Sequence, residues 1–245
     1  MHGLLPWLVI LFNYVKCKEE VSISTPLTKF VGTVEDTVIV FKGIPYAEPP
    51  IGRLRFQPPR PKRQYPNPYY AYEYSAECLQ SELFTTGHCP TMSEDCLYLN
   101  IWIPSSSKSK TYPVMVWIYG GAFLQGGANK PLYYGHSLAS RGVIVVSFNY
   151  RLGALGFLVS TSDGLFGNYG LADQKLALQW VRDNIKYFSG DTNQITLFGE
   201  SAGAMSIGLQ LIDQQHAKSL ALGPTSTLFN NVILQSNPLG YRCLK

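Results

Sequence analysis

A serine set between two glycines is the feature of this chain that could do chemistry. Ser201 follows Gly199 by two residues and precedes Gly203 by two, which gives the spacing G-x-S-x-G. A serine nucleophile on a tight strand-to-helix turn needs glycines at these positions, because side chains there would collide with neighbouring backbone. The spacing therefore predicts a nucleophile elbow with Ser201 as the nucleophile. A serine in an ordinary glycine-rich turn is the alternative.

The sequence on both sides of Ser201 favours the elbow. Residues 195–198 have the composition of a short buried strand, and Met205, Leu209 and Ile212 recur afterwards at the spacing i, i+4, i+7. That spacing is typical of an amphipathic helix with these residues on its apolar face. Ser201 is thus predicted to lie between a strand and a helix.

A second glycine-rich segment could supply the hydrogen-bond donors that a serine nucleophile requires. Residues 119–123, Tyr-Gly-Gly-Ala-Phe, end the strand-like run 114–119. Backbone N–H groups in such a loop, together with the N–H that follows the nucleophile, can hold the oxyanion of a tetrahedral intermediate. We expect an oxyanion loop here. Taken alone, a Gly-Gly turn that ends a strand would be the ordinary interpretation.

The rest of the chain must position these two segments. Apolar and β-branched runs predict strands over residues 27–40, 96–103, 114–119, 143–148 and 231–235. Residues 171–185 have a helical pattern with one apolar face, formed by Leu171, Leu176, Trp180 and Ile185. Residues 44–68 are rich in proline and are expected to run extended over a surface. The alternation of strand and helix around the elbow indicates an α/β fold with a parallel sheet.

Composition and charge describe a globular chain of one domain, or at most two. The chain has 245 residues, 46% of them hydrophobic, and a formal net charge of +4. Its basic cluster, within residues 53–63, alternates with prolines and apolar residues, and no recognition helix or aromatic platform accompanies it. We therefore expect a solvated loop there and no nucleic-acid partner.

The N-terminus has the pattern of an export signal. Residues 4–15 are almost wholly apolar, a run too short to span a bilayer comfortably but suited to the h-region of a signal peptide. We expect a signal peptide over residues 1–17, a mature chain without a transmembrane span, and delivery to the secretory-pathway lumen or the exterior. A membrane-retained signal anchor is the alternative. Nothing in the sequence indicates an oligomeric state.

The cysteines are compatible with disulfides in an oxidising compartment. Four of them remain once Cys17 leaves with the leader, and four cysteines allow three pairings. No C-x-x-C pair or cysteine–histidine cluster has the spacing of a zinc site. The sequence therefore predicts no structural metal site.

Several long motifs, all in the same order, resemble the type-B carboxylesterase and cholinesterase family over nearly the whole mature chain. Besides the elbow, the matching segments are residues 41–50, 94–102, 114–123, 149–153 and 167–174. The resemblance implies an α/β-hydrolase fold, with a central, mostly parallel sheet flanked by helices. Residues 21–245 would form part of that domain, with its C-terminal half missing. The implied activity is carboxylic-ester hydrolysis on a small-molecule ester through an acyl-enzyme, without a cofactor.

The resemblance also implies roles for particular residues. Ser201 matches the nucleophile, and Gly121, Ala122 and Ala202 match the backbone donors of the oxyanion hole. Ala122 replaces the third glycine of the more usual Gly-Gly-Gly, which keeps the N–H but adds a methyl group that would narrow the acyl side of the site. Ser189 similarly stands where the family more often has glycine.

Structural pairs follow from the same resemblance. Cys78 and Cys96 match the disulfide that closes an early loop, which leaves Cys89 and Cys243 unassigned. Two ion pairs of the family fall on Arg55 with Glu94 and on Arg151 with Asp173, and both would be structural. The alternative interpretation is that these residues are exposed charges that contribute little to the stability of the fold.

One departure bears on the substrate. Cholinesterases carry, between the two cysteines of that loop, a tryptophan that binds the choline cation, and this chain has no tryptophan between Cys78 and Cys96. Phe84 would be a weak substitute for cation–π binding. We therefore do not expect acetylcholine to be the substrate.

The chain lacks an evident base for the serine. In α/β-hydrolases the order is serine, then a carboxylate, then histidine. Glu200 matches a residue that lines the site rather than the triad acid, while Asp213 and His216 lie near the far end of the predicted elbow helix. His88 and His136 precede the elbow. We expect the triad acid and histidine to lie beyond Lys245, so that this chain alone is inactive.

Two interpretations of that gap remain open. The chain could be a fragment or a short isoform of a longer esterase, in which residues 231–235 form an unpaired apolar sheet edge. It could instead be a non-catalytic, cholinesterase-like binding or adhesion protein, because members of this superfamily have lost the triad and kept the surface.

Overall fold

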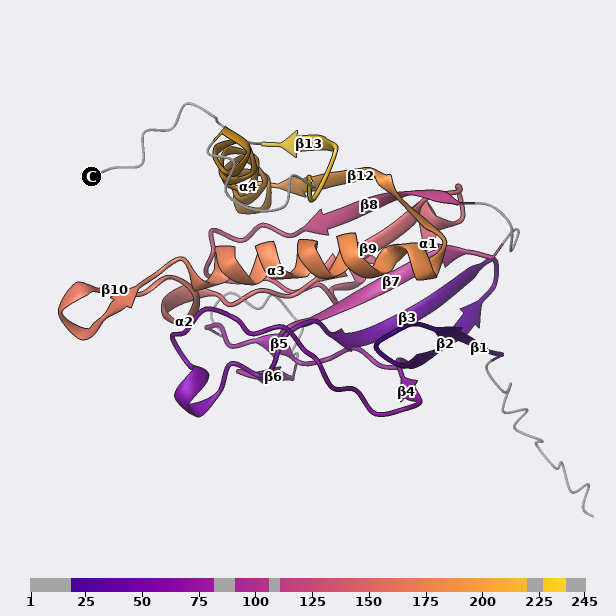
Figure 1. The fold of residues 1–245 in the computed structure, drawn as a ribbon, viewed down its shortest axis with the longest axis horizontal. Helices are drawn as coiled ribbons and strands as arrows, with labels where there is room; N and C mark the ends of the chain where they lie inside the picture. The colour runs from indigo at the N-terminus through magenta and orange to yellow at the C-terminus, as the bar shows by residue number, and fades with distance from the viewer. Residues whose placement is uncertain (1–18, 82–90, 106–110, 220–226, 237–245) are drawn as a thin grey trace, which may run out of the picture.

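The computed structural model describes residues 19–81, 91–105, 111–219 and 227–236. The predicted leader, Phe84, Cys89 and Cys243 lie outside these residues. The described chain forms one large sheet with helices packed on it (Figure 1). In spatial order its main strands are β1 (Glu20–Ser24), β2 (Lys29–Glu35), β3 (Val38–Pro45), β7 (Tyr98–Pro104), β9 (Ile144–Phe148), β8 (Tyr112–Ile118), β12 (Gly190–Glu200) and β13 (Asn231–Gln235).

The sheet has two halves of different character. From β1 through β2, β3 and β7 to β9 each pair is antiparallel, whereas β9, β8, β12 and β13 run parallel to one another. A ninth strand, β4 (Tyr69–Tyr70), pairs with β2. The predicted strands are confirmed. The parallel arrangement applies to the half that carries the elbow and, outside it, to the β2–β4 pair. Among the described residues β13 is the sheet edge, as predicted.

Alternation along the strands separates two apolar layers. Ile101 and Ile103 of β7 face the larger cluster, while Trp102 between them faces a smaller cluster that includes Ala139. This period of two is what a strand buried on both faces requires. Helix α1 (His136–Ala139) packs on the smaller cluster, so the two faces of the sheet are both covered.

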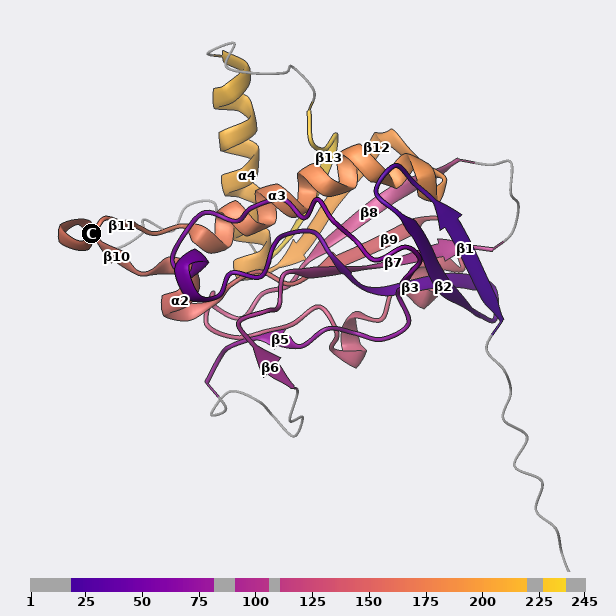
Figure 2. The same ribbon diagram turned by 60° about the horizontal axis from the view of Figure 1, so that its bottom comes forward.

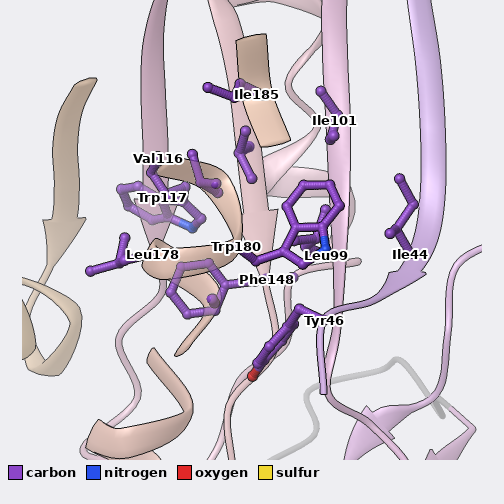
Figure 3. Packing of buried hydrophobic residues seen from close by; sticks show 14 of the residues in the cluster. Ile44, Tyr46, Leu99, Ile101, Val116, Trp117, Phe148, Leu178, Trp180 and Ile185 are labelled. Atoms are coloured by element: carbon purple, nitrogen blue, oxygen red, sulfur yellow. The ribbon is translucent and has the colours of Figure 1, made fainter. Parts of the chain in front are cut away.

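Helix α3 (Tyr169–Asn184) covers the larger cluster. Its Leu178 and Trp180 lie in the same cluster as the strand residues Leu99, Ile101 and Phe148 (Figure 3). The predicted apolar face is only partly correct: Trp180 and Ile185 are buried, but Leu171 and Leu176 are half-buried.

Polar residues take the inward positions that those leucines were expected to hold. Asp173 and Gln174 are both fully buried, because Asp173 pairs with Arg151 and Gln174 donates a hydrogen bond to Ser206 Oγ at 3.0 Å. Buried polar partners therefore determine which side of α3 faces inward.

Helix α4 (Ala202–Ser219) corrects a prediction more strongly. Its buried side contains Ala204 and Ile207, whereas Leu209 and Ile212 of the predicted apolar face are 46% and 62% exposed. The side turned inward is rich in small residues, and Gln210 donates a hydrogen bond to the Leu171 carbonyl at 2.9 Å. Close approach through small residues has decided the orientation of the helix. In Figure 2, α4 rises away from the sheet from the end of β12.

The remaining elements are short. The proline-rich segment runs extended as predicted, interrupted by a single turn of 3₁₀-helix at Gly52–Leu54. Other such turns lie at Pro131–Tyr133, Thr161–Asp163 and Ile185–Phe188. The other short elements are helix α2 (Gly153–Phe157) and the two-residue strands β5 (Glu77–Cys78), β6 (Met92–Ser93), β10 (Val159–Ser160) and β11 (Leu165–Phe166).

Candidate active site

Ser201 occupies a sharp turn between β12 and α4. Its backbone has φ of +54°, in the left-handed region that residues with side chains rarely adopt. Its N–H donates to the carbonyl oxygen of Gln235 at 2.9 Å, and its own carbonyl accepts from the N–H of Met205 at 2.9 Å. A strained turn of this kind persists only when its surroundings fix it.

The two glycines of the motif account for part of that fixation. A Cβ on Gly199 would lie 2.7 Å from the Ile118 carbonyl oxygen, and a Cβ on Gly203 would lie 2.0 Å from the same atom. Neither distance leaves room for a side chain. The G-x-S-x-G spacing is thus explained by the close approach of the turn to the end of β8.

The glycine loop, residues 120–127, passes directly beside the serine. A Cβ on Gly120 would lie 3.1 Å from Cβ of Ser201 and 2.6 Å from the carbonyl oxygen of Glu200. At the next position Gly121 has φ of +110°. The structure therefore brings the predicted oxyanion segment and the predicted nucleophile together.

The loop keeps an unusual conformation beyond its glycines. Ala122 and Phe123 have φ of +55° and +62°, although both carry side chains. The carbonyl of Gly121 accepts hydrogen bonds from the N–H groups of Leu124 at 3.0 Å and Gln125 at 3.1 Å. The carbonyl of Phe123 accepts from the N–H of Gly153 at 2.8 Å. These bonds hold the backbone in a tight turn against the serine.

Two stacked tyrosines support the start of the loop. The rings of Tyr119 and Tyr150 lie 4.5 Å apart at an angle of 17°, and the Tyr150 hydroxyl donates to the Tyr119 carbonyl at 2.9 Å. In return the Tyr119 hydroxyl donates to the Tyr150 carbonyl at 3.2 Å. Burial raises the pKa of both phenols above the ordinary value, so both remain neutral donors at physiological pH.

Ala202 lies at the first position of α4 and is 1% exposed. The N–H groups of a helix's first turn have no partner within the helix, and they form its electropositive end. Those of α4 begin directly after Ser201. This end of the helix is suited to stabilise negative charge that develops beside the serine.

An apolar hollow adjoins the glycine loop. Its volume is about 390 Å³, and eight residues line it: Ala122, Phe123, Leu124, Gly153, Phe157, Asn168, Leu171 and Leu209. Asn168 is the one polar side chain in this set. The hollow could hold an apolar group attached to a carbonyl that reacts at Ser201.

Acidic and phenolic groups lie near the elbow, but the described histidines do not. Glu200 is exposed beside Ser201, and burial, with a further contribution from Glu200, raises the pKa of Tyr133. His136 contacts the carbonyl of Glu35, the last residue of β2, through Nε2 at 3.1 Å. His216 lies on α4 about 22 Å along the helix axis from Ser201, at 1.5 Å per residue.

The predicted ion pairs are both present and differ greatly in burial. Arg151 holds Asp173 through Nε to Oδ2 at 2.8 Å and Nη2 to Oδ1 at 2.7 Å, and both side chains are at most 4% exposed. Burial raises the pKa of Asp173, and the Arg151 bonds oppose that shift. Arg55 binds Glu94 by two hydrogen bonds of 2.6 Å, but its side chain is 46% exposed.

The described cysteines form one disulfide, Cys78–Cys96. It ties β5 to the residue two before β7, and Gln80, two residues after Cys78, donates a hydrogen bond to the Gly126 carbonyl of the glycine loop. Among the residues that the structure describes, no three His, Cys, Asp or Glu side chains gather to hold a metal ion. In the same residues no helix is both long and apolar enough to cross a membrane.

Sequence reasoning missed several residues that build this site. Gln80 binds the backbone of Gly126 in the glycine loop, and Asn149 binds the N–H of Ala128, just after the loop. Tyr150 binds the carbonyl of Tyr119, just before the loop. Asn149 and Tyr150 lie in the motif at residues 149–153. The motif indicated that these positions are important, but it did not indicate which residues they contact. Gln80 had no signal beyond its position near Cys78.

The fold and the elbow together identify the class of protein. The sheet is parallel around β12, and a sharp turn at Ser201 connects β12 to α4, with the glycine loop beside the serine. This arrangement is the α/β-hydrolase fold. The model of the carboxylesterase family matches residues 19–240. The chain therefore belongs to the carboxylesterase family.

Individual relatives agree with this assignment. The chain is 44% identical over 231 residues to the acetylcholinesterase of Electrophorus electricus, a match that covers 85% of this chain and 36% of that protein. It is 45% identical over 220 residues to the para-nitrobenzyl esterase of Bacillus subtilis, covering 87% and 43%. A solved PNB esterase structure superposes with a TM-score of 0.77 at 41% identity, covering 88% and 44%. The chain spans less than half the length of these relatives.

Proposed function

We propose that this chain carries the nucleophile and the oxyanion hole of a serine carboxylic-ester hydrolase. The observation that carries the proposal is the contact between the strained Ser201 turn and the glycine loop, whose Gly120 lies against Cβ of Ser201. Family membership supports ester hydrolysis in general. The geometry adds a place where a serine hydroxyl and several backbone donors could meet one carbonyl group.

The proposed reaction has two steps. Ser201 Oγ attacks the ester carbonyl, and the N–H groups of Gly121, Ala122 and Ala202 stabilise the oxyanion of the tetrahedral intermediate. The alcohol leaves with a proton, and the acyl group stays on Ser201 as an ester. Water then attacks the acyl-enzyme through a second tetrahedral intermediate, and the carboxylic acid leaves. No metal or organic cofactor takes part in this scheme.

We place the acid and the base outside this sequence. Serine is a weak nucleophile until a histidine accepts its proton, and neither of the histidines that the structure describes, His136 and His216, lies beside Ser201. Loss of a triad histidine costs on the order of a million-fold in turnover. We therefore propose that the 245-residue chain is inactive by itself and that the complete enzyme contains a carboxylate and a histidine downstream.

The hollow beside the loop supports an apolar substrate group. Ala122 lines it together with Phe123, Phe157 and Leu171, and this apolar lining favours an aliphatic or aromatic group over a charged one. An uncharged ester is therefore expected to react better than acetylcholine. Competition between phenyl acetate and acetylcholine on the full-length protein would check this preference.

We also propose that the mature protein is exported, because the disulfide Cys78–Cys96 requires an oxidising compartment. The apolar N-terminal run supports a cleaved leader. Cleavage can be checked by N-terminal sequencing of the secreted protein. A mature N-terminus after residue 17 is expected, whereas an intact Met1 on a membrane-bound product would contradict the proposal.

The test of the proposed function is covalent labelling. A fluorophosphonate probe should label the full-length wild-type protein and fail to label Ser201→Ala. Ser206→Ala, which changes a buried serine five positions along α4, is the matched control and should leave labelling intact. Labelling that survives Ser201→Ala would refute the role of Ser201. Absence of labelling in the full-length wild type would favour the non-catalytic binding or adhesion protein.

A further inference from the structure

The glycine loop needs support from outside itself. Gly121, Ala122 and Phe123 all have positive φ, in succession, and two of these residues carry side chains that disfavour it. A backbone held in such a conformation reverts unless the surrounding structure fixes it. If its N–H groups are to meet an oxyanion, they must already be oriented before the substrate arrives, because reorientation would cost rate.

Gln80 supplies such support at the far end of the loop. Its side-chain Nε2 donates to the carbonyl of Gly126 at 2.8 Å, and its Oε1 accepts from the N–H of Gly126 at 2.7 Å. The amide thus satisfies both backbone groups of one residue, as a neighbouring strand would. A neutral amide can donate and accept at once, and the glutamine side chain is long enough to reach both groups of Gly126.

The loop and the segment that carries Gln80 fit without space between them. A Cβ on Gly126 would lie 2.5 Å from the Tyr119 ring, and a Cβ on Gly127 would lie 2.4 Å from the Glu77 carboxyl group. Gln80 Nε2 also lies 3.1 Å from Glu77 Oε2. The position of Gln80 is therefore itself fixed by its neighbours.

A second amide ties the same two segments. Asn149 Oδ1 accepts from the N–H of Ala128 at 2.8 Å, and Asn149 Nδ2 donates to the carbonyl of Ala76 at 3.1 Å. The disulfide anchors the end of this segment, since Cys78 is two residues before Gln80. Residues 76–80 and 126–128 thus behave as one block.

A short path connects Gln80 to the proposed oxyanion donors. Gln80 holds Gly126, and the preceding residue, Gln125, donates its N–H to the carbonyl of Gly121. That carbonyl belongs to the peptide unit whose nitrogen is that of Ala122. The orientation of one proposed donor is therefore coupled to the clamp two hydrogen bonds away.

We propose that Gln80 is a positioning residue that holds the glycine loop in the conformation required to stabilise the oxyanion. This role rests on the proposed serine-esterase function and adds a residue to it. Gln80 touches neither the serine nor the reacting carbonyl in this scheme, and it acts through Gly126. Its removal should slow the chemical step and leave binding of the ester largely unchanged.

The experiment measures phosphonylation kinetics of the full-length protein with a fluorophosphonate. Gln80→Glu keeps the acceptor but places an oxygen beside the Gly126 carbonyl and a second carboxylate beside Glu77. The maximal rate constant for labelling should fall at least tenfold, and the half-saturating probe concentration should stay within twofold. Gln80→Met, which keeps the side-chain length without its hydrogen bonds, should behave in the same way and serves if Gln80→Glu does not fold.

A matched control separates positioning from a general loss of stability. Tyr69→Phe removes a hydrogen bond of 2.6 Å from β4 to the Gly43 carbonyl of β3, which is not part of the elbow or the glycine loop. Its labelling rate constant should stay within twofold of the wild type. A Gln80 variant that labels at the wild-type rate, or a loss that Tyr69→Phe reproduces, would overturn the proposal.

Amide hydrogen exchange distinguishes failure of this proposal from failure of the proposed function. Exchange at residues 121–126 should accelerate at least tenfold in the Gln80 variants, while exchange at residues 195–199 of β12 should not change. Unchanged exchange in a wild type that labels normally would refute the clamp alone. Absence of labelling in the wild type would refute the esterase function, and with it the role assigned to Gln80.

Discussion

Gly203, in the first turn of α4, lies so close to Ile118 at the end of β8 that a Cβ would come within 2.0 Å of the Ile118 carbonyl oxygen. This contact places the helix that starts after the elbow directly on the strand that leads into the glycine loop. The proposed nucleophile and its proposed donors are thus fixed relative to each other by backbone packing rather than by side chains. Such packing suits a site that must be formed before the substrate binds.

Gly203→Ala should therefore be costly. A methyl group forced against a strand carbonyl requires the start of α4 to shift, and overpacking of this kind costs about 3 kcal/mol of unfolding free energy. Gly164→Ala is the control, because no atom lies within 4 Å of the Cβ position of Gly164, although its φ of +71° itself disfavours a side chain. Its cost should be about 1 kcal/mol. Urea unfolding followed by tryptophan fluorescence compares the two, and equal costs would contradict the packing argument.

Asp173→Asn should destabilise the protein strongly. It leaves the guanidinium of Arg151 buried without its counter-charge, and breaking a buried pair in this way costs about 3 to 5 kcal/mol. Lys175→Gln breaks the pair of Lys175 with Asp213, in which each side chain is 52% exposed. That change should cost less than about 1 kcal/mol. Thermal unfolding of both variants tests this difference in stability. Similar unfolding midpoints for the two variants would contradict it.

The orientation of α4 can be tested with two isoleucines on the same helix. Ile207 is fully buried and Ile212 is 62% exposed. Ile207→Ala should lower the unfolding free energy by about 2 to 5 kcal/mol, because it leaves a cavity. Ile212→Ala should change it by less than about 0.5 kcal/mol. The reverse order would restore the face predicted by periodicity and would show the packing of α4 to be wrong.

A pH dependence follows from Glu94. The hydrogen bonds from Arg55 hold the pKa of Glu94 below its ordinary value. The pair's contribution is therefore complete above the unfolded-state pKa of about 4.3 and is lost as the pH falls through the lower folded-state pKa. The difference in unfolding free energy between wild type and Glu94→Gln should be at most about 1 kcal/mol near neutrality. It should shrink in acid below pH of about 4. A difference independent of pH would exclude this origin.

Much of the fold could be predicted because the patterns of strands and of residues that interrupt regular structure are local in the sequence. The buried run in β9, the proline-rich segment and the edge strand β13 all lie where the sequence placed them. The antiparallel half of the sheet is also understandable, since the described residues between β2 and β7 contain no α-helix of the kind that connects parallel strands. Local pattern and topology agree in these parts.

What could not be predicted depends on contacts between distant residues. Periodicity indicated that residues after the elbow form a helix, but small residues such as Ala204 decided which side of it faces inward. In α3, Asp173 and Gln174 face inward because they form hydrogen bonds with Arg151 and Ser206. The hydrophobic periodicity of the sequence does not indicate these partners.

The same reason explains the site. The spacing of Gly199, Ser201 and Gly203 predicts the elbow, because the turn leaves no room for side chains at the two glycine positions of the motif itself. Gln80 belongs to the site only because the chain folds it against Gly126, 46 residues later. A lone glutamine in a loop has no distinguishing pattern, so its role became visible only with the structure.

The central claim is that Ser201 forms an acyl-enzyme. The most direct test is to mix the full-length protein with p-nitrophenyl butyrate, quench in acid within the first turnover, and analyse the digested protein by mass spectrometry. We expect one butyryl group on the peptide that contains Ser201 in the wild type and none on the corresponding peptide of Ser201→Ala. Ester hydrolysis without that adduct, or an adduct that persists in Ser201→Ala, would contradict it.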